Sequence, residues 1–220
     1  MKLKVGHIII IISSYLLYTT ATSCVKEAKC DCSADTVRIA RIFQPTASIG
    51  KDAVIESIAP DQNFGNQTML AVFSWTSSGV FNNARALIQF DFSSIPSQTS
   101  IAKAELSLYW KPYSNLTDQT GENAFSIYRV TQPWNESTVT WNNQPTFNNT
   151  PKVAVPKTMA VDQSLLNIDV TTMVQDMINN PSSNFGFMLQ LNNEFPYSLV
   201  ILASSNDPDQ SKHPKLIVSF

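Results

Sequence analysis

Short apolar runs, each ended by Asn, Pro, Ser or Gly, follow one another from about residue 50 to the last residue of the chain. Runs of this length between turn-forming residues are typical of β-strands. The strands predicted on this basis are 53–58, 68–75, 84–92, 103–111, 125–130, 138–141, 152–155, 165–169, 186–192, 198–204 and 215–220. Many short strands in succession predict an all-β fold: one jelly-roll-type antiparallel β-sandwich over residues 51–220.

The run 103–111 shows the alternation of a half-buried strand most clearly. Its large apolar side chains Leu106, Leu108 and Trp110 fall on one face. Because successive side chains of a strand point to opposite faces, we expect Trp110 in the core and Tyr109 at the surface.

One segment has helical rather than strand periodicity. Apolar residues recur there at a spacing of three and four, and they are Val170, Met173, Val174, Met177 and Ile178. This spacing predicts one short helix with a single buried face. Asp169 is placed to cap its start, and Asn180 followed by Pro181 is expected to end it.

The N-terminus has the pattern of an export signal. Lys2 and Lys4 precede an apolar stretch, and small residues then lead to Cys24. We predict a signal peptide over residues 1–23, because the stretch is too short for a comfortable membrane span. Small residues directly before a cysteine resemble a bacterial lipoprotein signal, so Cys24 is the predicted lipid attachment site; cleavage by ordinary signal peptidase nearby is the alternative.

Residues 24–50 are expected to form a tether between the signal and the first strand. They contain Cys30 and Cys32, whose spacing lacks the further ligands that a zinc site needs. A local or an intermolecular disulfide is possible in an oxidising compartment.

Charge and histidine content exclude several function classes. Charged residues make up only 15% of the chain and the net charge is −2, so no broad basic surface exists to bind nucleic acid. The two histidines are His7, inside the predicted signal, and His213. A His-dependent triad or metal site could therefore use only His213.

Several phrases in fixed order resemble the DNRLRE domain, which is grouped with the family 96 carbohydrate-binding modules. They are APDQNFG at 59–65, RALIQFDFSSIP at 85–96, IAKAELSLY at 101–109, WNESTVTWNNQP at 134–145, IDVT at 168–171, NFGF at 184–187 and PKLIVSF at 214–220. The resemblance implies a β-sandwich on a secreted or surface protein, and it implies polysaccharide binding.

Carbohydrate sites commonly pair a flat aromatic ring with amides and carboxylates that bind hydroxyl groups. Two parts of the chain supply both kinds of side chain. The first candidate site comprises Tyr109, Lys111 and Tyr113, and the second comprises Trp134, Glu136, Trp141 and Asn142 with its neighbour Asn143. The alternative for the second set is that its tryptophans fill the core at one end of the sandwich.

Two further pairs of residues carry carboxylate or amide side chains, and each pair is better explained by turns than by a metal or catalytic site. Asp61 and Asn63 are a weak candidate for a structural calcium site, although their spacing fits a turn better than a calcium loop. Asp91 and Asp169 each follow a strand and precede a Ser or Thr two residues later, which favours turn hydrogen bonds over acid catalysis.

The sequence contains no Gly-x-Ser-x-Gly elbow, no HExxH and no phosphate-binding glycine loop. We therefore predict a non-catalytic polysaccharide-binding module without cofactor, exported and displayed at a bacterial envelope through its lipid, or secreted. A structural or adhesive protein that contacts protein partners is one alternative. A small polysaccharide-degrading enzyme is the other, because two carboxylates suffice for glycoside hydrolysis.

Overall fold

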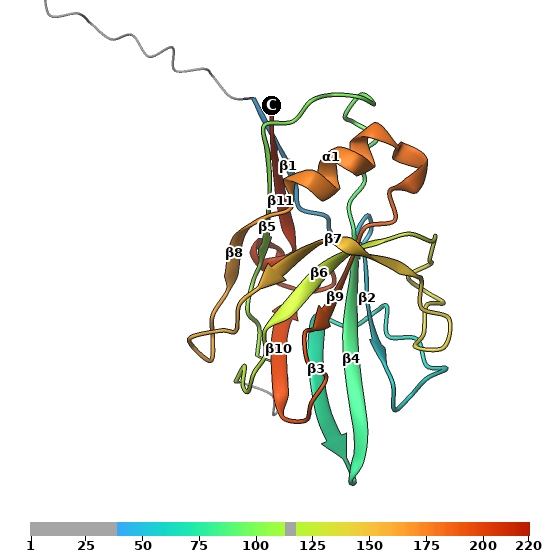
Figure 1. The fold of residues 1–220 in the computed structure, drawn as a ribbon, viewed down its shortest axis with the longest axis vertical. Coiled ribbons are helices and arrows are strands. Elements are labelled where there is room, and N and C mark those ends of the chain that lie inside the picture. The colour runs from blue at the N-terminus through green and yellow to red at the C-terminus, as the bar shows by residue number, and fades with distance from the viewer. Residues whose placement is uncertain (1–38, 113–117) are drawn as a thin grey trace, which may run out of the picture. The chain divides into compact units, whose positions relative to one another are not determined.

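Strands and turns dominate the computed structural model, which describes residues 39–112 and 118–220 (Figure 1). Its strands are β1 (Ala40–Phe43), β2 (Lys51–Glu56), β3 (Met69–Ser77), β4 (Val80–Gln89), β5 (Lys103–Leu108), β6 (Phe125–Val130), β7 (Phe147–Val155), β8 (Leu165–Asp169), β9 (Phe187–Leu191), β10 (Ser198–Ala203) and β11 (Lys215–Ser219). Its helices are α1 (Thr171–Asn179) and the 3₁₀ turns η1 (Pro181–Ser183) and η2 (Gln210–Lys212).

The strands form two antiparallel sheets. One has four strands in the order β1-β11-β5-β8, and the other has seven, in the order β10-β3-β4-β9-β6-β7 with β2 also paired to β4. Side chains from both sheets, such as Leu106 and Leu216 on one and Ala86 and Ile88 on the other, meet in one apolar core. The predicted all-β antiparallel sandwich with one short helix is confirmed.

A second, smaller core covers the other face of the seven-stranded sheet. Leu87 points away from Ala86 and Ile88 because side chains alternate along β4. It packs with Ala53, Ile55, Val130, Trp134, Val139 and Met188. The loop 131–146 carries Trp134 and Val139, so this loop closes the sheet face that a two-layer sandwich would leave open to water.

Helix α1 buries the predicted stripe of Met173, Val174, Met177 and Ile178 in the main core. Before it, Asp169 Oδ1 accepts hydrogen bonds from the Thr171 backbone N–H at 3.0 Å and from the Thr171 hydroxyl at 2.6 Å. These bonds lower the pKa of Asp169. Asp91 makes the same pair of bonds to Ser93, so the prediction that both aspartates serve turns is confirmed.

Three local predictions differ from the structure. Strand β1 lies within the range expected to be tether, where it pairs with β11; most of its side chains are exposed, so it has no apolar alternation. Residues 138–141 form turns of the covering loop instead of a strand. Trp110 lies beyond β5, whose register shifts between Leu106 and Leu108, and it is half-buried beside Leu202 instead of fully in the core.

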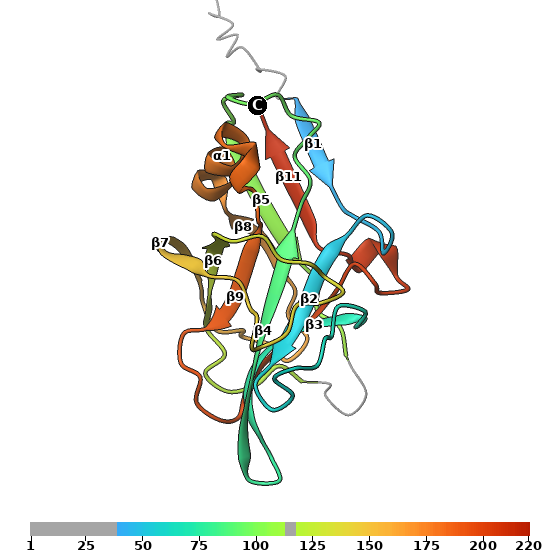
Figure 2. The ribbon, with the colours of Figure 1, turned by 90° about the vertical axis from the view of Figure 1, so that its right-hand side faces the viewer.

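The β3–β4 hairpin projects from one end of the sandwich, and the C-terminus and β1 lie at the other end (Figures 1 and 2). Its turn is Ser78-Gly79, between the paired residues Ser77 and Val80. Both turn residues have positive φ, 50° and 80°, as a two-residue turn of type I′ requires.

Candidate functional site

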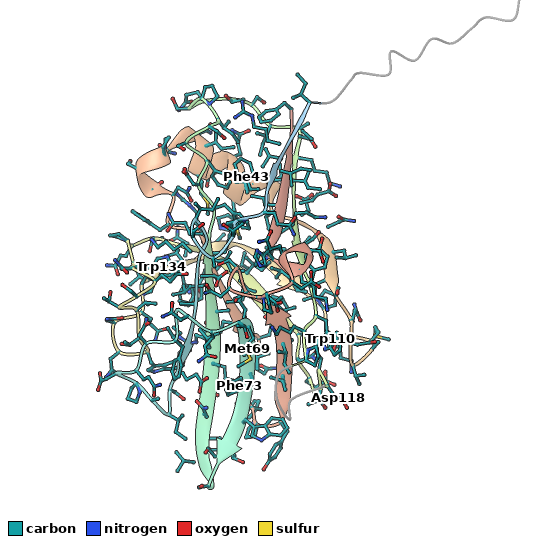
Figure 3. All side chains as sticks on the ribbon, turned by 180° about the vertical axis from the view of Figure 1, so that it is seen from behind. Phe43, Met69, Phe73, Trp110, Asp118 and Trp134 are labelled. Carbon is teal, nitrogen blue, oxygen red and sulfur yellow. The ribbon has the colours of Figure 1, made fainter. Side chains whose placement is uncertain are left out.

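The two candidate sites predicted from the sequence lie on different sides of the molecule. Trp134 and Trp110, which is next to Tyr109, are on opposite sides of the ribbon in Figure 3. They therefore cannot form one continuous binding surface, and each set is described separately below.

Trp134 is part of the second core and is only 8% exposed. Its indole N–H donates a hydrogen bond to the Phe185 carbonyl at 2.9 Å. The ammonium group of Lys51 lies 4.5 Å from the centre of its ring. With its ring buried and its only donor satisfied, Trp134 holds the covering loop on the sheet.

The other residues of this candidate site, Glu136, Trp141 and Asn142, also contact other parts of the protein. Glu136 accepts a hydrogen bond from the Asp52 backbone N–H at 2.9 Å, and burial raises the pKa of its carboxyl group. Trp141 is half-buried beneath the Arg85 guanidinium, 4.6 Å from the ring centre. Asn142 is exposed and donates to Asp61 at 2.7 Å.

Asp61 and Asn63 connect two loops. The side-chain amide of Asn63 donates to the carbonyls of Glu136 and Val139, both at 2.7 Å. In the ranges that the structure describes, no group of three or more His, Cys, Asp or Glu side chains could hold a metal ion. Calcium binding at this loop stays a prediction.

The other predicted set is Tyr109, Lys111 and Tyr113. Tyr109 is half-buried, and the Lys215 ammonium group lies 5.5 Å from its ring centre. Lys111 forms an ion pair with the buried Asp207. Tyr113 lies outside the described residues. Both Tyr109 and Lys111 thus make contacts that join the end of β5 to the last strand and to the loop before it.

A buried polar cluster lies beside Lys111 and Glu136. Asp52, 2% exposed, accepts a hydrogen bond from the Ser205 N–H at 2.7 Å. Burial raises its pKa from 3.8 to about 6. His213 is equally buried, with its two ring nitrogens 2.8 and 2.7 Å from the carbonyls of Pro45 and Asp207. Both nitrogens of His213 are therefore engaged with backbone, so the ring has a structural part in this cluster.

A groove that the sequence did not point to lies on the β3–β4 hairpin. It has a volume of about 110 Å³ and is lined by Phe73, Trp75, Thr76, Ser77, Asn82 and Leu199. We call it the Trp75 groove. Phe73 and Leu199 are buried members of the main core and form its apolar floor. Because β3 continues past the buried part of the sheet, the next residue on the same face, Trp75, stays half-exposed.

A second aromatic ring stands against Trp75. The Tyr197 ring packs edge-on to the Trp75 ring, with centroids 5.1 Å apart and planes at 89°. Tyr197 is 58% exposed, so an aromatic ring that faces solvent adjoins the Trp75 groove and supports the Trp75 indole.

Asn82 supplies the polar side of the groove and is held in a fixed orientation. It faces Trp75 across the β3–β4 pair. Its side-chain N–H donates to Glu56 Oε2 at 3.0 Å, and its oxygen accepts from the Ile58 N–H at 3.3 Å. Apolar rings with a positioned amide and carboxylate are the combination that binds a sugar, whose ring has apolar C–H faces and a polar edge.

Comparison with known families finds a match over most of the chain. The model of carbohydrate-binding module family 96 matches residues 44–220. The chain belongs to carbohydrate-binding module family 96. A search of curated proteins found no match.

The match to family 96 begins at residue 44, just after β1, and ends at Phe220, just after β11. Both predicted sites and the Trp75 groove lie within it. Among its described helices, none is long and apolar enough to cross a membrane.

Sequence reasoning missed the Trp75 groove in this family 96 module for a definable reason. The sequence predicts a strand over 68–75, where an aromatic residue such as Trp75 needs no further explanation. The available signal was its position just before the Ser78-Gly79 turn, which puts it near the end of a hairpin. Its partner Tyr197 is 122 residues away in sequence and lies in a loop, so only the fold brings the two rings together.

Proposed function

We propose that this family 96 module is a non-catalytic polysaccharide-binding domain of an exported protein. The observation that carries the proposal is the Trp75 groove, because it places the half-buried Trp75 ring and the exposed Tyr197 ring beside a fixed amide. Family membership supports carbohydrate as the ligand. The remaining polar side chains singled out from the sequence mostly make bonds within the protein.

The proposed mechanism is adsorption of a sugar residue without chemistry. The C–H face of the sugar stacks on the Trp75 indole, and Asn82 and Glu56 exchange hydrogen bonds with its hydroxyl groups. Little reorganisation is needed, because Tyr197 supports the indole and the Asn82 side chain is already held in place.

A polysaccharide screen of the full chain tests the proposal. Affinity gel electrophoresis and a glycan array, both with neutral and acidic polysaccharides, should show retardation or capture by at least one polymer. The matched control is the same protein unfolded in urea and run in urea. If the folded chain binds no polymer, polysaccharide binding is refuted and the adhesive alternative becomes the leading hypothesis.

The proposal includes display at a bacterial cell envelope through a lipid on Cys24. It is supported by the predicted export signal and the small residues before Cys24. An attached lipid would hold a binding domain at the cell that uses the polysaccharide.

A further inference from the structure

The ring of His213 contacts two groups that can only accept hydrogen bonds. Its Nδ1 lies 2.8 Å from the Pro45 carbonyl oxygen, and its Nε2 lies 2.7 Å from the Asp207 carbonyl oxygen. A neutral imidazole has one N–H and one lone pair, and a carbonyl oxygen has no proton to donate. Both bonds therefore form only when the ring is protonated on both nitrogens, as an imidazolium.

Two acidic side chains lie near enough to this ring to balance its charge. Asp52 of β2 is buried, and Asp209 caps the start of η2. Burial raises the pKa of Asp52, and hydrogen bonds from Ser205 and then the charge of His213 act against this increase. Hydrogen bonds from Ser211 lower the pKa of Asp209, and the charge of His213 adds to this effect. A buried imidazolium thus has anionic neighbours that offset its cost.

The other charged groups around the ring interact with one another or with these two carboxyl groups. The ring nitrogens themselves contact backbone oxygens, so a change in the charge of the ring makes or breaks a bond to the backbone. The other groups are Lys111 paired with Asp207, Glu136 with its neighbours Lys51 and Asp52, and Lys212 next to His213 in the chain.

The Pro45 carbonyl belongs to residues 44–50, which connect β1 to β2 and which we call the junction segment. No residue of the junction segment is buried. Polar contacts hold it to the β10–β11 loop: besides the bond to His213, the Gln44 side chain donates to the carbonyls of Ser211 and His213, at 3.3 and 3.1 Å. Because burial of apolar groups contributes little here, the loss of one hydrogen bond has a large effect on local opening.

We infer that His213 is a protonation-dependent latch between the junction segment and the β10–β11 loop. The imidazolium donates to both carbonyls and closes the latch. When the ring loses one proton, one nitrogen presents a lone pair to a carbonyl oxygen, so one bond is lost and the segment opens more often. The family 96 match begins in this segment, at residue 44, so the latch acts where the chain enters the domain and does not depend on the Trp75 groove.

Nitrogen-15 NMR of the full chain labelled at histidine tests the protonation of the ring. The chain has two histidines, so His7→Gln leaves the signals of His213 alone. At pH 5 both ring nitrogens should carry a proton, and one proton should leave as the pH rises. A ring with only one protonated nitrogen at pH 5 would overturn the inference.

Hydrogen exchange measured by mass spectrometry tests the opening of the junction segment. The amides of Ile49 and Gly50 are bonded to the Thr46 carbonyl inside the segment, and their exchange is corrected for its intrinsic dependence on pH. Their protection should fall about tenfold between pH 5 and pH 8, because a hydrogen bond from a charged donor is lost. The amides of β6 report global unfolding, and the fall at the junction segment should exceed any change there.

Two variants connect the opening to the ring. His213→Gln cannot change its charge and cannot donate to both carbonyls as the ring does, so protection of the junction segment should be low and independent of pH. Gln44→Ala is the matched control, because it removes a bond between the same two segments that does not titrate. It should lower protection at every pH and leave the tenfold change in place. If His213→Gln fails to fold, the NMR and exchange of the natural protein still decide.

Asp52→Asn separates the ring from its buried acidic neighbour. Because ionised Asp52 favours the imidazolium, this variant should keep the change in protection and shift it to lower pH. A change that disappears in Asp52→Asn, or that persists in His213→Gln, would assign the effect to another group and overturn the inference. Protection that stays constant while the ring titrates would overturn it as well.

Discussion

At the scale of single residues, Asp52 shows how burial makes stability depend on pH. Its pKa is raised to about 6 mainly because its carboxyl group is buried, and the Ser205 hydrogen bond only partly offsets this. Between about pH 4 and pH 6 the folded protein thus holds a proton that the unfolded chain has released. The free energy of unfolding must fall as the pH rises through this range.

We predict that Asp52→Asn removes this dependence. Asn keeps an oxygen for the Ser205 N–H but has no charge to bury. A pKa raised from 3.8 to about 6 corresponds to roughly 3 kcal/mol. The free energy of unfolding of the variant should therefore rise, relative to that of the natural protein, by up to this amount between pH 4 and pH 7. Urea unfolding at each pH measures it. A difference between the two proteins that stays constant with pH would contradict the explanation.

At the scale of structural elements, the loop 131–146 behaves as a third layer. It lays Trp134 and Val139 over Leu87 and Ile55 on the sheet face. Most of its polar groups that we singled out bond to the strands or to neighbouring loops. A loop of this kind stabilises the sheet as a helix does in an α/β protein.

We predict that Trp134→Ala lowers the free energy of unfolding by about 3–5 kcal/mol, the usual cost of deleting a large buried ring. The polysaccharide affinity of the variant that remains folded should not change. Asn142→Ala, which removes one exposed hydrogen bond of the same loop, should cost about 1 kcal/mol or less. Calorimetry gives the stabilities. A small loss at Trp134 together with lost binding would instead favour its predicted place in a glycan site.

Elements with clear periodicity could be predicted from the sequence, and those formed by pairing alone could not. Strands 125–130 and 165–169 have the predicted bounds, and α1 buries the predicted stripe. Strand β1 has mostly exposed side chains and forms a strand only because it pairs with β11. Residues 138–141 are β-branched and aromatic, but they belong to a turn that fits over the sheet.

The candidate site was harder to predict than the fold, because it depends on where strands end relative to the covering layer. Alternation predicts Tyr109 outward, and it is half-buried, but alternation cannot show that Lys215 lies over it. Trp75 and Phe73 share a face, yet one is buried and the other is half-exposed. Only the tertiary structure shows where along β3 the core stops.

At the scale of the whole molecule, Cys24 is the proposed point of attachment to the membrane. We predict that Cys24→Ser moves the protein from the membrane fraction to the soluble fraction, because the thiol is the proposed acylation site. Cys30→Ser, six residues further on, is the matched control and should leave the protein with the membranes. Fractionation followed by mass spectrometry of the N-terminal peptide checks both. Unchanged partitioning of Cys24→Ser with no lipid on the peptide would rule out the anchor.

The opposed positions of β1 and the β3–β4 hairpin have a consequence for how weak binding could be used. The described chain enters the sandwich at β1, and the β3–β4 hairpin, whose strand β3 carries Trp75, projects from the far end (Figure 2). In the proposed arrangement, many copies anchored side by side could each bind the same repeating polymer. Their combined avidity would then exceed the affinity of any single copy. Each copy could release and rebind while the polymer as a whole stays attached.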